Sequence, residues 1–499
     1  MEAAALSWVW VRGTGIGSLA PPVPFTAAAH PEPRPPSVLF VLTDDQRWDA
    51  LSKMPIVQRS LVGHGITFSN AFVSNSLCCP SRSSILTGDY SHSTGVYRQT
   101  PPYGRFEWFD DRSTVATWLH DAGYTTGLFG KYIDGYQHAA VTGYVPPGWD
   151  RWAAFVHEGY YDYSLTIAGH ISKYGATPGE YSESVLTRQA VSFIRRTKGP
   201  LFVYFAPAAP HAPAVPARRD LQAFANLKPW RPPNYNETDV SDKPAYIRAL
   251  PRLNGAARKE EDAFRRRQYA TLLSVDRSVG QLLRALKATG RLSKTLVVFT
   301  SDNGIAWGEH RWTKKEVPYE ESIRVPLVVR YDRMIARPRV DRHLVVNVDL
   351  APTIAQVTGV GRPRDDGRSL VPLLRSQRAP WPRDFLLEHM EGTNPVPTFC
   401  GVRSERYVFV HYATGEDELY DLRRDPFELR NEVDRPRAAT ARAAMQRRLA
   451  ELCDPPPPGL TGPSRAGPVA ATIVLPLVTA ALFLLAERRR RGPAGTTRG

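Results

Sequence analysis

The chain has 499 residues, of which 42% are hydrophobic and 23% are charged. It is therefore long enough for a large core and for more than one domain. The formal charge is +15, but the sequence has neither zinc-finger spacing nor alternating basic and aromatic residues, so a nucleic acid is not an expected partner.

The first 36 residues are expected to precede the folded part. Residues 1–29 are moderately apolar, but Glu2 precedes the apolar part and Arg12 interrupts it, which matches an export signal poorly. Residues 31–36 are rich in proline and read as an extended linker. We expect either a degenerate export signal or a misassigned start, followed by this linker.

The first predicted strand covers residues 38–43, a short continuous apolar run typical of a strand buried on both faces. Asp44 and Asp45 follow it directly. Carboxylates at the carboxyl end of a buried strand are well placed for a ligand crevice, although a solvated turn is the simpler explanation for the pair in isolation. A helix near residues 57–62 and a strand over residues 65–72 come next.

Residues 76–88 contain two adjacent cysteines, Cys78 and Cys79, followed by Pro80 and Arg82. Proline suits the first turn of a helix, so a group at position 78 would lie at a helix N-terminus, which favours anions. Arg82 lies one turn further on and would add a fixed cation. A cysteine pair alone would more simply be part of a core.

The complete run resembles the sulfatase signature, which is Cys-x-Pro-Ser-Arg followed by Leu-Thr-Gly. The resemblance implies that a formylglycine-generating enzyme converts Cys78 to formylglycine, the catalytic residue of that family. It also implies that Asp44 and Asp45 form half of a calcium site. His92 follows the run, where it could line the site or serve a structural role.

A helix over residues 115–122 and a strand over residues 125–130 lead to Lys131. The sequence Gly-Lys-Tyr at this point resembles the family element whose lysine contacts the sulfate. Many arylsulfatases carry a histidine two residues after this lysine, whereas this chain has Ile133. The form without that histidine resembles the glucosamine-6-sulfatase branch.

His211 follows a helix over residues 182–196 and a buried strand over residues 201–205. A lone loop histidine is usually incidental. However, Pro210 and Pro213 make this loop resemble the Pro-His-x-Pro loop of sulfatases, which implies that His211 binds sulfate or protonates the leaving oxygen. Residues 216–259 then read as a long surface insertion, in which Asn236 is a possible glycosylation acceptor.

A helix over residues 260–288 precedes the strand at residues 295–300, which ends in Asp302 and Asn303. These side chains offer hard oxygen ligands, although Asp-Asn-Gly alone is merely a good turn. The resemblance implies that they complete the calcium site, together with the residue at position 78. The family also has a lysine four residues before Tyr-Glu, which selects Lys315 over Lys314.

The character of the chain changes after about residue 376. Residues 345–358 resemble a structural helix of the family, whereas residues 401–403, 407–410, 418–422 and 425–431 read as short antiparallel strands. They resemble the small C-terminal subdomain of sulfatases. Cys400 and Cys453 could form one disulfide if the protein is exported.

Residues 469–486 carry no charge and are just long enough, at about 1.5 Å per residue, to span a bilayer. Four arginines at 488–491 follow and would stay in the cytoplasm, which places the main domain outside. A buried helix is the alternative, but the prolines at 455–458 separate this segment from the domain.

The alternation of strands and helices predicts an α/β domain with a largely parallel sheet between helices. Resemblance to sulfatases refines this fold to one related to alkaline phosphatase, plus the small antiparallel subdomain. The predicted parts are a leader and linker (1–36), a catalytic domain (37–375), a C-terminal subdomain (376–454), a linker (455–468), a membrane anchor (469–486) and a basic cytoplasmic tail (487–499).

The resemblance implies hydrolysis of a sulfate ester, of a sulfated sugar or an aryl sulfate, with one calcium ion. The residues implied in catalysis are Cys78, Arg82, Lys131, His211 and Lys315, of which Lys131, His211 and Lys315 bind the substrate. Two alternatives remain open: a phosphonate or phosphate diester hydrolase of the same superfamily, and a membrane-anchored binding protein without activity.

Overall fold

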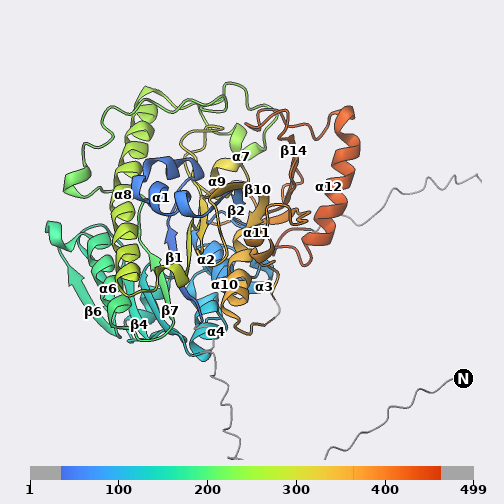
Figure 1. The fold of residues 1–499 in the computed structure, drawn as a ribbon. Coiled ribbons are helices and arrows are strands. Elements are labelled where there is room, and N and C mark those ends of the chain that lie inside the picture. Colours follow the sequence, from blue (N-terminus) through green and yellow to red (C-terminus); the bar gives the residue numbers. More distant parts are fainter. Residues whose placement is uncertain (1–34, 364, 462–499) are drawn as a thin grey trace, which may run out of the picture. The chain divides into compact units, whose positions relative to one another are not determined.

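The computed structural model describes residues 35–363 and 365–461, and the described residues from Pro36 onward form one compact unit (Figure 1). The apolar runs form the centre of a ten-stranded sheet, and its strands from β8 to β4 run parallel. In spatial order the strands are β10 (Arg339–Val346), β2 (Ile66–Phe72), β9 (Leu327–Arg330), β8 (Thr295–Ser301), β1 (Ser37–Thr43), β7 (Leu201–Ala206), β3 (Thr125–Gly130), β4 (Arg151–His157), β5 (Tyr163–Ile167) and β6 (His170–Tyr174).

Helices pack on both faces of this sheet, because β1 is apolar on both of its faces. Phe40 and Leu42 join one core with α2, α4, α10 and α11, whereas Leu39 and Val41 join a second core with α1, α6 and α8 (Figure 1). The helices are α1 (Pro55–Ser60), α2 (Cys78–Thr87), α3 (Ser91–Thr94), α4 (Val115–Asp121), α5 (Tyr136–Ala140), α6 (Ser182–Arg196), α7 (Ala245–Arg248), α8 (Gly255–Ala288), α9 (Glu320–Ile323), α10 (Leu350–Thr358), α11 (Val371–Arg375) and α12 (Ala439–Leu452). The predicted α/β fold with a central parallel sheet is confirmed.

A separate four-stranded antiparallel sheet follows, as predicted. Its strands are β11 (Phe385–His389), β12 (Phe399–Arg403), β13 (Tyr407–Tyr412) and β14 (Asp417–Asp421), and α12 packs on it. Cys400 and Cys453 form a disulfide that joins β12 to the end of α12. The predicted strand at residues 425–431 is wrong: this segment turns, because Pro426 lacks a backbone N–H and Glu428 has a φ of 55°.

Two predicted helices have different starts in the structure. Residues 345 and 346 belong to β10, where they pair with Ala71 and Phe72, and α10 begins only at Leu350. The long helix α8 begins at Gly255 rather than at residue 260, because Asn254 caps it by accepting a hydrogen bond from the N–H of Ala257.

The insertion at residues 216–259 includes the short helix α7 and the first turn of α8. Asn236 is buried within it, and its amide exchanges hydrogen bonds with the backbone N–H and carbonyl of Leu253. This side chain is therefore not available as a glycosylation acceptor in the folded protein.

The expected membrane anchor at residues 469–486 lies outside the residues that the structure describes. Among residues 35–363 and 365–461, no helix is long and apolar enough to cross a membrane.

Candidate active site

The site lies where two neighbouring parallel strands end. Asp44 and Asp45 follow β1, whereas Asp302 and Asn303 follow β8, and the parallel register of the two strands brings these ends together. The N–H of Asp45 donates to Oδ1 of Asp302 at 3.1 Å, and Nδ2 of Asn303 donates to Oδ1 of Asp45 at 2.6 Å. All four side chains are buried.

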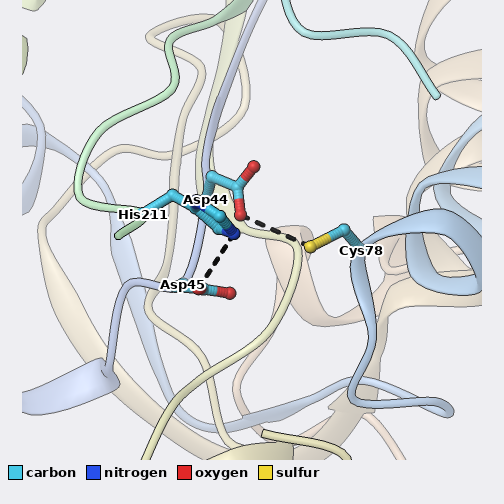
Figure 2. Close-up of side chains that lie close together, drawn as sticks. All are labelled: Asp44, Asp45, Cys78 and His211. Atoms are coloured by element: carbon cyan, nitrogen blue, oxygen red, sulfur yellow. Dashed lines mark hydrogen bonds and ion pairs between the residues drawn. The ribbon is translucent and has the colours of Figure 1, made fainter. Parts of the chain in front are cut away.

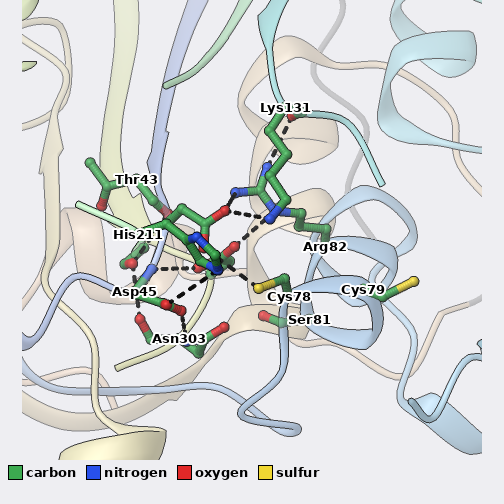
Figure 3. Close-up of polar contacts among 12 residues, drawn as sticks. Thr43, Asp45, Cys78, Cys79, Ser81, Arg82, Lys131, His211 and Asn303 are labelled. Carbon is green, nitrogen blue, oxygen red and sulfur yellow. Dashed lines mark hydrogen bonds and ion pairs between the residues drawn. The ribbon is translucent and has the colours of Figure 1, made fainter. Parts of the chain in front are cut away.

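Helix α2 brings Cys78 to these carboxylates, because Cys78 is its first residue. The thiol donates to Oδ1 of Asp44 at 3.5 Å (Figure 2). Burial and then the charge of Asp44 raise the pKa of this thiol well above its ordinary value. Cys79 points away from the cluster (Figure 3) and packs among apolar side chains. The helix ends at Gly88, whose φ of 87° suits glycine.

Arg82 holds the carboxylates in place from within the helix. Its guanidinium donates to Asp302 at 2.8 Å, to Asp44 at 3.3 Å and to the carbonyl of Lys131 at 3.0 Å. Its side chain has no exposed surface. These bonds occupy all three guanidinium nitrogens, so Arg82 orients its neighbours instead of facing solvent.

The two carboxylates that Arg82 joins differ in their pKa. Burial alone would raise the pKa of Asp44, but the surrounding cations, Lys131 above all, hold it well below its ordinary value. Burial and the nearby charge of Asp44 raise the pKa of Asp302 to about 6.

Lys131 follows β3, and its Nζ lies 2.6 Å from Oδ2 of Asp44. The preceding residue, Gly130, has a φ of 125°, and a Cβ there would lie 1.9 Å from the carbonyl oxygen of Ala206. Only glycine allows this close approach, after which the chain delivers Lys131 to the cluster.

Lys315 and Lys314 differ sharply in their surroundings. The Nζ of Lys315 lies 2.7 Å from Sγ of Cys78 and 2.6 Å from Oδ1 of Asp45. Lys314 is exposed and donates to Oδ1 of Asn394 at 2.8 Å. Of the two lysines, the structure therefore brings Lys315 to Cys78, the one that the sequence motif selects.

His211 lies at the edge of the cluster, with its Nε2 3.7 Å from Oδ2 of Asp45 (Figure 2). Burial opposes the charged imidazolium, but the charges of Asp44 and Asp45 outweigh it and raise the pKa of His211. The loop is held because Tyr160 donates to the His211 carbonyl at 2.7 Å and Gln268 donates to that of Pro210 at 3.2 Å.

Several side chains of the cluster could together hold a metal ion. Ligand atoms of Asp44, Asp45, Cys78 and His211 lie within 4.8 Å of one another. In the part of the chain that the structure describes, Oδ1 of Asn303 is buried and accepts no hydrogen bond. An unsatisfied buried carbonyl oxygen beside carboxylates suits an oxygen-binding ion such as calcium.

Three polar residues that the sequence analysis did not single out also belong to the site. Asp134 and Glu158 lie 3.5 Å and 3.3 Å from Nζ of Lys131, and Gln99 joins Asp134 to the N–H of Cys79. They stand in loops without a recognisable motif, so only the fold reveals them. His92 lies outside the cluster, where its Nδ1 is 2.9 Å from Glu388 and its ring stacks on Tyr90.

Two family models match the chain. The model for sulfatases covers residues 36–360, which include every site residue described above. The model for the C-terminal part of N-sulphoglucosamine sulphohydrolase covers residues 308–454, which include the four-stranded sheet.

Known proteins of similar sequence are also sulfatases by name. The chain is 33% identical over 372 residues to an extracellular sulfatase SULF-1 homolog of Drosophila melanogaster, a match that covers 71% of this chain and 33% of that protein. It is 35% identical over 387 residues to N-acetylglucosamine-6-sulfatase of Homo sapiens, covering 74% of this chain and 70% of that protein. The chain thus spans about a third of the length of the fly protein.

A solved structure shares the fold. It is a protein in complex with its substrate, D-glucosamine-2-N,6-O-disulfate, and it superposes with a TM-score of 0.73 at 25% sequence identity. The match covers 84% of this chain and 98% of that one.

Proposed function

Because this chain belongs to the sulfatase family, we propose that it hydrolyses a sulfate ester of a saccharide. The observation that carries the proposal is the convergence on Cys78, where Lys315 contacts the sulfur at 2.7 Å and Lys131 neutralises the adjacent Asp44. A sulfate ester is anionic, and preorganised positive charge is usually the largest catalytic contribution in such sites. The names of the human relative and of the ligand in the solved structure support a sulfated amino sugar as substrate.

We propose that a formylglycine-generating enzyme converts Cys78 to formylglycine. One hydroxyl group of the hydrated aldehyde attacks sulfur, and the ester S–O bond breaks to release the alcohol. The second hydroxyl group then loses its proton and re-forms the aldehyde, which expels sulfate. The position of this residue, buried at the N-terminus of α2 and facing Lys315, supports the proposal, because helix N–H groups and a lysine both favour the anionic group that must bind there.

The exposed fractions of the basic side chains suggest which role each of them has in catalysis. They are 0% for Arg82, 6% for Lys131, 14% for Lys315 and 31% for His211. Arg82 acts as a positioning residue for the carboxylates. Lys131 and Lys315 bind sulfate oxygens, and His211, which is nearest to solvent, gives a proton to the leaving oxygen.

Asp44, Asp45, Asp302 and Asn303 would hold one calcium ion together with the residue at position 78. When bound there, the ion would supply positive charge that stabilises the anionic sulfate group. The unsatisfied oxygen of Asn303 and the all-oxygen character of these four side chains support this assignment.

We further infer that the protein is exported and that residues 469–486 anchor it in the membrane. The fly relative is named an extracellular sulfatase, and the disulfide between Cys400 and Cys453 suits an oxidising compartment. The full-length chain should sediment with membranes, and a chain ending at Pro456 should be released. A full-length chain that stays in the supernatant with an intact C-terminus contradicts the anchor.

Peptide mass spectrometry and activity of two cysteine variants test the chemistry together. The peptide across residues 77–82 should carry formylglycine at Cys78 and a thiol at Cys79, because Pro80 and Arg82 lie two and four residues after Cys78 as in the family signature. Cys78→Ala should lose at least about a thousandfold in kcat, because it lacks the nucleophile. Cys79→Ala is the matched control and should keep most of its activity.

The substrates in this assay separate the alternatives. Purified enzyme is assayed on N-acetylglucosamine-6-sulfate, on 4-nitrophenyl sulfate and on a phosphonate and a phosphate diester. Preference for the diesters would favour the phosphodiesterase alternative, and no turnover of any compound would favour a binding protein. An active preparation whose Cys78 is wholly unmodified would refute the formylglycine mechanism.

A further inference from the structure

Two carboxylates next to Lys131 are not explained by the proposed metal site. Asp134 and Glu158 lie 3.5 Å and 3.3 Å from its Nζ, in addition to Asp44 at 2.6 Å. Both side chains are 27% exposed, whereas Lys131 is 6% exposed. Both carboxylates therefore flank the lysine that we propose binds sulfate, and both reach solvent more than the lysine does.

Their position has an electrostatic cost for a site that must bind an anion. A negative charge within 3.5 Å of Lys131 offsets part of the attraction that the lysine exerts on a sulfate group. The two carboxylates therefore need a role that compensates for this cost.

Asp134 has such a role within the protein. Its Oδ2 accepts a hydrogen bond from Nε2 of Gln99 at 2.5 Å, and Oε1 of Gln99 accepts from the N–H of Cys79 at 3.2 Å. Asp134 thus connects Lys131 to the first turn of α2 and fixes the lysine relative to Cys78.

Glu158 has no comparable role. Glu158 is the first residue after β4. Its carboxylate forms an ion pair with Lys131 and has no other hydrogen-bond or ion-pair partner among residues 35–363 and 365–461. An ionised carboxylate offers about four acceptor positions, so most of those on Glu158 are left free by the described residues.

We propose that Glu158 is a specificity-determining residue, whose carboxylate accepts a hydrogen bond from a hydroxyl or ammonium group on the sugar that carries the sulfate. The inference rests on the proposed function and deepens it. Such a bond selects a saccharide over an aryl sulfate, because an aryl ring has no donor to offer and leaves the carboxylate desolvated and unpaired.

The test compares Glu158→Gln and Glu158→Ala with the unaltered enzyme on three substrates. These are N-acetylglucosamine-6-sulfate, glucosamine-6-sulfate and 4-nitrophenyl sulfate. Hydrogen bonds to charged groups are strong enough that kcat/KM for the sugars should fall about tenfold more than for the aryl sulfate, chiefly through KM. The larger loss should occur with Glu158→Ala, because glutamine keeps an acceptor oxygen.

The sugars also distinguish the donor. A larger loss on glucosamine-6-sulfate than on the N-acetylated sugar identifies an ammonium group, and equal losses identify a hydroxyl group. Asp162→Asn, an exposed carboxylate four residues further along the chain, is the matched control and should leave all three values as they are.

Equal losses on the sugars and the aryl sulfate would mean that Glu158 only positions Lys131, and would overturn the inference, as would no change at all. If the enzyme turns over no sulfate ester, the proposed function fails but Glu158 is still tested. Calorimetric binding of the two sugar sulfates to Cys78→Ala should then weaken about tenfold when Glu158→Gln is added. Unaltered or undetectable binding would overturn the inference in that case.

Discussion

The site contains two pairs of identical neighbouring residues, Cys78 with Cys79 and Lys314 with Lys315. In each pair, one residue contacts the cluster and the other does not. Successive residues of a helix point about 100° apart, so Cys78 faces Lys315 while Cys79 packs in the core. Lys315 likewise reaches Asp45, while Lys314 stays on the surface with Asn394. Residue type alone does not separate the members of either pair, whereas register within the element does.

The proposed calcium site predicts the behaviour of Asp45→Asn. Asp45 has a φ of 64°, a conformation that asparagine tolerates well, so the variant should fold normally. Because ligand charge sets the affinity for calcium, removal of one carboxylate charge should weaken binding at least about tenfold. Elemental analysis after dialysis should find about one calcium per unaltered chain and much less in the variant.

The matched control for this variant is again Asp162→Asn, an exposed change that also occurs at a positive φ of 51°. It should retain its calcium. If Asp45→Asn retains a full equivalent while Asp162→Asn behaves as the unaltered chain, the ion is held elsewhere and the ligand assignment is wrong.

Sequence patterns reveal the site residues that lie in motifs but not those that lie between them. Cys78, Lys131 and Lys315 stand in short runs with fixed spacing, so each is recognisable before the fold is known. Glu158 is a single carboxylate in an ordinary loop. The role that we propose for it depends on β4 ending beside β3, a relation in space that no local spacing encodes.

At the scale of elements, parallel strands explain why these distant residues meet. Strands β8, β1, β7 and β3 are neighbours, and the segments after them supply Asp302, Asp44, His211 and Lys131 respectively. Carboxyl ends of parallel strands meet at one edge of a sheet, which is where ligands of such folds bind. The buried apolar runs made these strands predictable.

The elements that the sequence analysis placed wrongly are those whose pairing depends on the rest of the fold. Residues 345 and 346 continue a helix-like apolar pattern, yet their pairing with β2 makes them part of β10. Residues 425–431 alternate suitably for a strand, but Pro426 breaks the ladder and Asp425 and Glu428 form a turn. A local sequence pattern does not show which strand a segment can pair with in the folded protein.

Helix α6 carries a buried carboxyl group that should make stability depend on pH. Glu183 is 1% exposed, and burial raises its pKa from 4.5 to about 7. Between these values the folded state binds more protons than the unfolded state, so the free energy of unfolding falls as pH rises from about 4.5 to 7. Glu183→Gln should remove up to about 3 kcal/mol of this dependence.

Chemical denaturation at several pH values between 5 and 8 measures this effect. The unaltered chain should lose stability across the range, and the Glu183→Gln profile should be flatter. Glu260→Gln, an exposed change on α8, should reproduce the unaltered profile. Parallel profiles for the unaltered chain and Glu183→Gln would show that this carboxyl group titrates normally.

At the scale of the whole molecule, the two sheets share one apolar core. Phe72 and Val346 of the large sheet pack with Phe385 and Leu387 of the small one. A buried carboxylate reinforces the contact, because Glu418 on β14 accepts hydrogen bonds from Tyr319, beside α9, and from Tyr412 and Tyr420. We therefore expect the small sheet to stabilise the catalytic part rather than to move freely against it.

The disulfide between Cys400 and Cys453 fastens the small sheet to α12 and leads to the final prediction. It links positions 53 residues apart, and closing a loop of that length removes entropy from the unfolded chain. The double variant Cys400→Ala/Cys453→Ala should lose about 2–4 kcal/mol of stability, with a Tm several degrees lower. Its kcat/KM should remain that of the unaltered enzyme, because both cysteines lie outside the cluster around Cys78.

Treatment of the unaltered protein with a reductant should lower its Tm to that of the double variant. The same treatment should leave the Tm of the double variant unchanged. A reductant that lowers both Tm values equally, or neither, would contradict a stabilising disulfide and with it one argument for export.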